Sequence, residues 1–265
     1  MTLWYVYLMW RRPANHDQGV NWGRYLLTFE NRYVADEYYI TLCSLTTADG
    51  RPRFNLLTRT APQLWAFDSV QETGSGDNGW WWAPIFIWRD RRFAGDLGRF
   101  ANSVMHIYLS DGNHSQRNDW PILNDQAEGA DWLDGGAFYI RNKRHRTRFW
   151  HDAGDGFVQV STTMHTKFRV TRQSLGTRLV AGDAKQVLTR SDVVQVCPVG
   201  SVGPIRYIEA SAPGKIRLST ARNTIKFGDF FSGLGSTWEP TGSGSLKQFV
   251  TRTTDADEGD EWELC

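Results

Sequence analysis

Cysteine is scarce in this sequence, and neither sign of charge dominates it. The three cysteines, Cys43, Cys197 and Cys265, lie far apart and form no Cys-x-x-Cys motif. That pattern favours buried thiols in a reducing compartment over a framework of disulfides. The formal net charge of the 265 residues is only +1. Because such a chain has no overall field that attracts nucleic acid, we expect no nucleic-acid partner.

Long apolar runs are also missing. No stretch reaches the ~18 residues that a membrane-spanning helix needs, so we expect no membrane span. The N-terminal run MTLWYVYLMWRR has no positive residue before its apolar part and no small-residue cleavage site. We interpret it as a strand rather than a signal peptide. This predicts synthesis in the cytoplasm, with a non-classical route for any release.

Catalytic and metal-binding motifs are absent from the sequence. It has no HExxH, CxxC, GxSxG, P-loop or GxGxxG motif, and its six histidines are scattered. Residues 111–115 alternate oxygen-bearing side chains, but Gln116 replaces the glycine that a calcium loop requires and Ile122 replaces its last ligand. We therefore predict no metal and no cofactor. An acid–base pair built on His151-Asp152 or on the carboxylates of 119–134 would still suit a glycoside hydrolase.

Short strand-like runs make up most of the chain. They are rich in β-branched and aromatic residues, are bounded by Gly, Asn, Asp and Pro, and recur every 8–15 residues or so. The runs are 2–10, 23–29, 37–45, 52–58, 63–70, 104–110, 137–141, 156–162, 166–172, 178–182, 204–210, 215–220, 224–230 and 246–252. This pattern predicts an all-β fold.

One segment has helical spacing instead. Phe93, Leu97, Phe100 and Val104 recur at i, i+4, i+7 and i+11, which predicts a short helix or an ordered loop.

A change in composition suggests two domains. Residues 118–136 are dense in Asp, Gly and Asn, as expected of a connection. We expect a β-rich, trefoil-like domain over 1–130 and a β-trefoil-like domain over 131–265, with the boundary inside 118–136.

Residues 135–172 contain an aromatic strand, a turn, a second strand with an aromatic pair, then "FVQVST" and "KFRVTR". This segment resembles one four-stranded repeat of a β-trefoil. Gln63-Leu64-Trp65 in 51–70 is similar to the Q-x-W motif that closes repeats of ricin-B-like lectins, and 206–230 has a similar rhythm. The resemblance, to ricin-B-like or amaranthin-like lectins, implies two tandem trefoils or one trefoil plus a second β domain. It also implies that Gln63 and Trp65 are core residues.

Tryptophan is abundant, with 13 residues, and GWWWAPIFIWRD at 79–90 holds four of them. On a strand, Trp80 and Trp82 share one face and Trp81 takes the other, so at least one indole should be exposed. The rings either cover an apolar layer or form a platform for the apolar face of a sugar. In the second case the neighbouring Asp77 and Asn78 would bind its hydroxyls.

Two Asp-Trp pairs repeat this combination. Asp119-Trp120 and Asp131-Trp132 each place a carboxylate beside an indole in a stretch rich in Gly and Asn. Each pair is either a further sugar contact or a turn with a core anchor.

The only basic cluster is RNKRHRTR at 141–148. If extended, it places Arg144, Arg146 and Arg148 on one face, where they could bind sulfate, sialate or phosphate groups. The alternative is a solvated hairpin tip. Six acidic residues in 255–263 form either a frayed end or a segment that lies across this cluster.

These patterns together predict a soluble, non-catalytic carbohydrate-binding protein whose partners are glycans or glycoconjugates. It could also form a homodimer. The alternatives are a glycan-directed hydrolase or other small-molecule enzyme, and a glycan-targeted pore-forming toxin.

Overall fold

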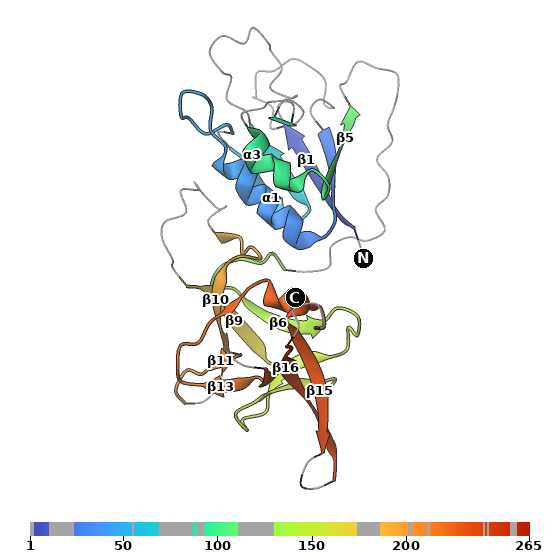
Figure 1. The fold of residues 1–265 in the computed structure, drawn as a ribbon, viewed down its shortest axis with the longest axis vertical. Coiled ribbons are helices and arrows are strands. Elements are labelled where there is room, and N and C mark those ends of the chain that lie inside the picture. The colour runs from blue at the N-terminus through green and yellow to red at the C-terminus, as the bar shows by residue number, and fades with distance from the viewer. Residues whose placement is uncertain are drawn as a thin grey trace. The chain divides into compact units, whose positions relative to one another are not determined.

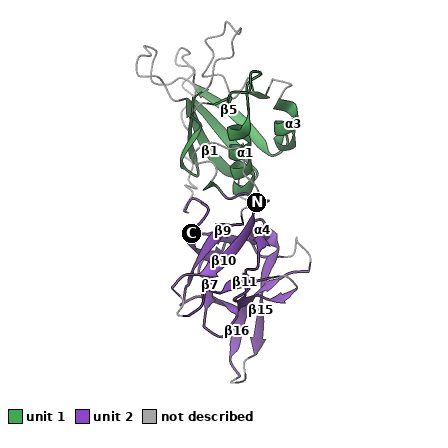
Figure 2. Cartoon of the chain, turned by 90° about the vertical axis from the view of Figure 1, so that its left-hand side faces the viewer, with its two compact units in different colours: residues 1–127, 178–187 green, residues 128–177, 188–265 purple. Residues whose placement is uncertain are grey.

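The chain folds into two compact units. The computed structural model describes residues 3–10, 24–54, 56–68, 87–88, 93–110, 130–173, 186–200, 203–210, 213–240, 242, 244–254 and 259–265. Unit 1 comprises residues 1–127 and 178–187, and unit 2 comprises residues 128–177 and 188–265 (Figure 2). The structure is mostly β-sheet with few helices, as the strand pattern predicts (Figure 1).

Unit 1 is built on a five-stranded sheet. Its strands are β1 (Trp4–Trp10), β2 (Arg24–Phe29), β3 (Thr58–Ala61), β4 (Leu64–Phe67) and β5 (Val104–Ser110), in the order β3-β4-β1-β2-β5. The neighbours are antiparallel except β1 and β4, which are parallel. A parallel pair needs a long crossover connection, and here that connection includes helix α1 (Arg32–Ser44).

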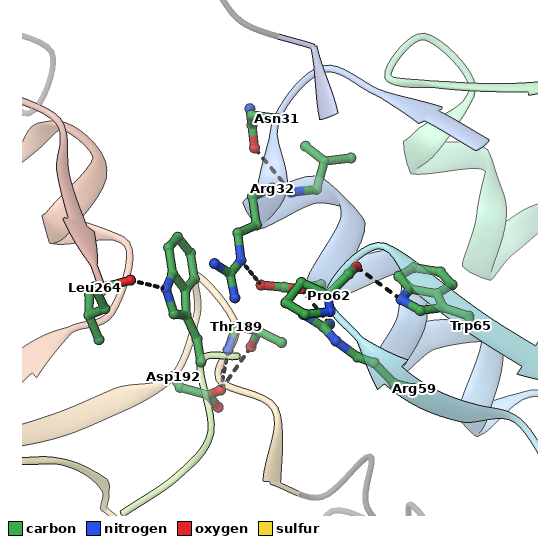
Figure 3. Close-up of polar contacts among 11 residues, drawn as sticks. Asn31, Arg32, Arg59, Pro62, Trp65, Thr189, Asp192 and Leu264 are labelled. Carbon is green, nitrogen blue, oxygen red and sulfur yellow. Dashed lines mark hydrogen bonds and ion pairs between the residues drawn. The ribbon is translucent and has the colours of Figure 1, made fainter. Parts of the chain in front are cut away.

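Helix α1 corrects the prediction of a strand over 37–45. It begins after Asn31, whose side chain accepts a hydrogen bond from the Val34 N–H at 3.1 Å (Figure 3). Tyr38 and Tyr39 are buried against the sheet, and their rings lie 5.5 Å from Phe29 and 5.0 Å from Trp65, respectively. The aromatic residues of this run therefore pack one face of a helix.

The Q-x-W motif also lies in a different strand arrangement from the one that the resemblance implies. Trp65 is fully buried, as the resemblance implies, and its indole N–H donates to the Pro62 carbonyl at 3.1 Å (Figure 3). It lies on β4, which forms a hairpin with β3 and pairs in parallel with β1. Residues 51–70 are therefore not the end of an antiparallel four-stranded repeat, and the hypothesis of two tandem trefoils is wrong for this unit.

The helical spacing around Phe93 is confirmed. Residues Ala94–Leu97 form the short helix α3, which continues into a 3₁₀ turn over Gly98–Phe100. Leu97 and Phe100 are buried, as the spacing predicts.

Unit 2 is almost entirely antiparallel sheet. Its larger sheet follows the path β12-β16-β8-β7-β6-β9-β10-β14, with β15 paired to β16 and β17 paired to β6. The strands are β6 (Ala137–Asn142), β7 (Phe149–Asp152), β8 (Val158–Ser161), β9 (Lys167–Arg172), β10 (Val193–Pro198), β12 (Gly214–Lys215), β14 (Ile225–Lys226), β15 (Leu234–Pro240), β16 (Leu246–Arg252) and β17 (Trp262–Leu264). Strands β11 (Tyr207–Glu209) and β13 (Arg217–Ser219) form a separate pair, and α4 (Asp229–Ser232) is one short helix.

An aromatic cluster forms the core of unit 2. Trp150 is fully buried, and its ring lies 5.6–5.7 Å from those of Phe168, Phe230 and Trp262. Side chains alternate between this core and the outer face, as the pleat of a strand requires. On β9, for example, Phe168 is buried while Lys167 is exposed.

Candidate functional site

One indole on β15 is open to solvent. Trp238 is 56% exposed, and it is the only exposed tryptophan among the residues that the structure describes. It lies opposite Gln248 on β16 in a hairpin that projects from unit 2 (Figures 1 and 2). Tryptophan is usually buried for most of its surface, so an open indole marks this face as a candidate site.

A polar chain lies on the same face of the hairpin. The Gln248 amide donates to the Ser236 hydroxyl oxygen at 2.9 Å, and Ser236 Oγ donates to Asp260 Oδ2 at 3.0 Å. Ser236 is two residues from Trp238, so both side chains project from one face of β15. Asp260 is attached to the same strand, because its N–H donates to the Leu234 carbonyl at 2.9 Å. An ordered amide and a carboxylate therefore accompany the open ring.

The opposite face of the hairpin is fastened to the rest of unit 2. Glu239, the residue after Trp238, forms an ion pair with Lys215 at 2.7 Å. The Lys215 ammonium also lies 5.0 Å from the ring centre of Phe157 and 4.9 Å from that of Phe249. These cation–π contacts and the ion pair attach the face of the hairpin that points away from Trp238 to the rest of unit 2. Trp238 is thus presented on a supported strand, which favours recognition without rearrangement.

Apolar side chains border the ring towards the hairpin tip. Leu246 is 63% exposed and lies opposite Pro240, which is also exposed. The sequence contains a signal for this hairpin, the Gly-Ser-Gly-Ser run at 242–245 directly before the strand-like run 246–252. Sequence reasoning missed Trp238 because 234–240 does not alternate clearly between polar and apolar residues.

Most of the tryptophan site predicted from the sequence falls outside the described residues. These positions are Asp77, Asn78, Trp80, Trp81, Trp82, Asp119 and Trp120.

The second Asp-Trp pair is described, and Trp132 is a core anchor. Its ring is buried and packs edge-on against Phe227 at 5.4 Å, and its N–H donates to the Leu264 carbonyl at 3.0 Å (Figure 3). Asp131 beside it is half-buried. Of the two interpretations of this pair, the turn with a core anchor is therefore the one that the structure supports.

The basic cluster begins at the end of β6, and its residues 143–148 form a hairpin turn and not an extended strand. The His145 N–H donates to Asn142 Oδ1 at 2.8 Å, and the Asn142 N–H donates to the Arg148 carbonyl at 2.9 Å. Alternation along a strand therefore does not place Arg144, Arg146 and Arg148 on one face. Arg144 and Arg146 are exposed and Arg148 is half-buried, as in the alternative of a solvated tip.

The described end of the acidic C-terminal segment lies beside this cluster, which agrees with one of the two predicted arrangements for Glu261 and Glu263. Strand β17 pairs with β6. Glu263 binds Arg141 at 2.5 Å, and Glu261 binds Lys143 at 2.5 Å. Each pair is partly exposed, so each contributes modestly to stability.

A polar cluster in unit 1 has the chemistry of a structural contact. The Trp88 indole N–H donates to His106 Nε2 at 2.6 Å and lies 2.8 Å from the Tyr38 hydroxyl, which is itself 3.0 Å from His106 Nε2. Burial lowers the pKa of His106 to about 3. The imidazole is therefore neutral near pH 7, and its Nε2 accepts hydrogen bonds.

Two further groups with reactive side chains are the Cys43 thiol and the adjacent pair His151-Asp152. Burial raises the pKa of the Cys43 thiol to about 12, so the nucleophilic thiolate is not populated near neutral pH. His151 and Asp152 point to opposite faces of β7: His151 Nδ1 is 3.1 Å from Thr166 Oγ1, and Asp152 binds Arg206 at 2.6 Å. The adjacent pair therefore does not form an acid–base dyad.

Within the described part of the chain, no group of three or more His, Cys, Asp or Glu side chains is placed to hold a metal ion. None of its helices is long and apolar enough to cross a membrane. Comparison of the sequence with protein-family models finds no match, and comparison with curated proteins finds none either.

Proposed function

We propose that this chain is a non-catalytic carbohydrate-binding protein and that Trp238 is the platform on which a sugar ring stacks. The indole offers a large flat apolar surface of low conformational entropy, which suits the C–H face of a pyranose. Asp260 would bind the sugar hydroxyls beside it, because a carboxylate oxygen accepts hydrogen bonds, while Gln248 would hold Ser236 in place from below.

The observation that carries this proposal is the combination of an open indole with an ordered polar chain. Trp238 is 56% exposed, while Gln248 is buried and bonded to Ser236. A ring that only filled the core would be covered, and a solvated turn would not need a buried amide beside it. A shallow site of this kind on the surface of the fold is what we expect of a non-catalytic carbohydrate-binding protein.

The strand pairing of unit 2 supports a β-trefoil as the scaffold. In two successive segments the outer strands pair with each other, β6 with β9 and β10 with β14, while the inner strands form the hairpins β7–β8 and β11–β13. Strand β9 pairs with β10, and β17 returns to β6. The third segment, β15 to β17, departs from this pattern in its long hairpin. We propose one trefoil, in unit 2, joined to a different domain, unit 1.

A glycan-array screen of the purified chain tests the proposal. Wild type should bind a defined set of glycans, and Trp238→Ala should abolish that binding. Because the ring is mostly exposed, the same change should shift the free energy of unfolding by less than about 1 kcal/mol. Ile205→Ala is the matched control, since it removes an exposed apolar side chain of unit 2 that lies outside the hairpin, and it should retain glycan binding.

Two results would overturn this function. Trp238→Ala could bind the same glycans as wild type, which would remove the platform. Alternatively, light scattering could show that Trp238→Ala changes the oligomeric mass, which would make the ring part of an interface between copies.

A further inference from the structure

The outer face of β6 and β9 combines aromatic rings with cations. On β6, Phe138 and Ile140 point into the core, so Tyr139 and Arg141 point outward. On β9 the outward residues are Lys167 and Arg169. The register places Lys167 directly opposite Tyr139. We call this surface, together with Phe149 and His165, the β6–β9 face.

The rings of the β6–β9 face form one connected cluster. Phe149 and His165 lie 4.1 Å apart between ring centres, and Tyr139 lies 6.4 Å and 6.1 Å from them. The Lys167 ammonium is 5.1 Å from the centre of the Tyr139 ring. His165 is exposed, and Tyr139 and Phe149 are half-buried. The cluster therefore presents apolar surface next to a positive charge.

Among the residues that the structure describes, positive charge exceeds negative charge on and beside this face. The cations counted here are Arg141, Lys143, Arg144, Arg148, Lys167 and Arg169, and the described carboxylates that pair with them are Glu261 and Glu263. Lys167 and Arg169 are exposed, and neither forms an ion pair within the described ranges. The whole chain carries only +1, so its charge is distributed unevenly. A concentrated surplus of this kind attracts anionic ligands.

We propose that the β6–β9 face is a second binding site, for an acidic saccharide that carries carboxylate or sulfate groups. Lys167 and Arg169 would bind the anionic group through charge-assisted hydrogen bonds. Tyr139 and His165 would contact the apolar face of the sugar ring. This inference extends the proposed carbohydrate binding to a ligand class that Trp238 does not select.

The geometry favours a saccharide over a nucleic acid. Glu263, which is paired with Arg141, lies within the face, and its carboxylate can accept hydrogen bonds from hydroxyls, which a saccharide supplies more densely than a polynucleotide does. Phe149 and His165 also pack on each other, so the face does not offer a row of separate open rings on which successive bases would stack.

The test measures the affinity of the chain for three saccharides: dextran sulfate, an oligogalacturonide and unmodified dextran. Dextran sulfate shows whether sulfate groups are bound, the oligogalacturonide shows whether carboxylate groups are bound, and unmodified dextran gives the contribution of a neutral chain. Lys167→Gln combined with Arg169→Gln should weaken binding of at least one acidic saccharide by about tenfold or more. The matched control is Arg222→Gln combined with Lys226→Gln, which removes two exposed cations from the segment that ends in β14 and should change affinity less than about twofold.

Other variants and ligands distinguish this site from the Trp238 site. Trp238→Ala should keep its affinity for the acidic saccharides, and the Lys167/Arg169 variant should keep its affinity for glycans bound at Trp238. If neutral glycans never bind but the acidic ones depend on Lys167 and Arg169, the Trp238 function fails and this inference stands. It is overturned if the control loses as much affinity, if neither acidic saccharide binds, or if single-stranded polyuridylate binds as tightly as sulfated dextran.

Discussion

Replacing Asp36 with alanine would remove the carboxylate that lies between two buried guanidinium groups in unit 1. Asp36 Oδ1 is 2.5 Å from Arg59 Nη1, and Asp36 Oδ2 is 3.6 Å from Arg32 Nε (Figure 3). The exposed fractions of the three side chains are 1% for Asp36, 2% for Arg59 and 8% for Arg32. Water therefore cannot replace the carboxylate as a source of solvation for these cations.

The expected cost is large for a single side chain. Removing one partner of a buried ion pair costs about 3–5 kcal/mol, because the remaining guanidinium charges stay buried and lose their carboxylate. Asp36→Ala should lower the free energy of unfolding by that amount in urea denaturation followed by fluorescence. Asp49→Ala is the control, since Asp49 binds Arg51 at 2.6 Å with both side chains 49% exposed. An exposed pair of this kind contributes little to stability, so Asp49→Ala should unfold at nearly the same urea concentration as wild type.

Equal stability of the Asp36 and Asp49 variants would refute this reasoning. It would mean that the carboxylate of Asp36 is not what stabilises the two arginines.

Two other predictions concern titratable groups of unit 1. Burial raises the pKa of the Cys43 thiol, so iodoacetamide at pH 8 should leave Cys43 unmodified in the native chain. In urea the same reagent should alkylate it, and peptide mass spectrometry measures both results. Rapid labelling of the native chain would contradict the burial of this thiol. The pKa of His106 is lowered to about 3 in the folded state, against an ordinary value of 6.5, so between these values the unfolded chain binds more protons. Above about pH 6.5 the imidazole is neutral in both states and the free energy of unfolding is not reduced by it. As the pH falls from 6.5 towards 3, the free energy of unfolding decreases, because only the unfolded chain takes up the proton. Unfolding at a series of pH values should show this loss in wild type and a flatter profile in His106→Gln, and identical profiles would remove His106 as the cause.

Local patterns in the sequence predict the strands of unit 2 better than the topology of unit 1. In 166–172, alternation of Phe168 and Val170 with charged residues is enough to give both the strand and its buried face. Residues 37–45 are equally rich in aromatic and β-branched types but form the end of α1. The signals for that helix are the cap at Asn31 and the spacing of Tyr38 and Leu42, which composition alone does not reveal.

The type of site could be predicted from the sequence more readily than its position. An abundance of tryptophan predicts an open indole, but exposure depends on which strands cover each ring. Asp131 precedes Trp132 and Glu239 follows Trp238, so each indole has an acidic neighbour in the sequence. Of these two tryptophans, only Trp238 lies on a projecting hairpin. The ion pairs of Glu261 and Glu263 with the basic cluster could be proposed from charge, whereas the register of β17 on β6 that creates them is a long-range property.

The most direct test of the central claim follows the Trp238 indole N–H by NMR during a glycan titration. The resonance is assigned by its loss in Trp238→Phe, and the glycan is a ligand identified on the array. We expect the chemical shift of this resonance to change in a saturable way, with the same dissociation constant as calorimetry gives. A glycan that binds by calorimetry while the Trp238 resonance stays unchanged would contradict the account.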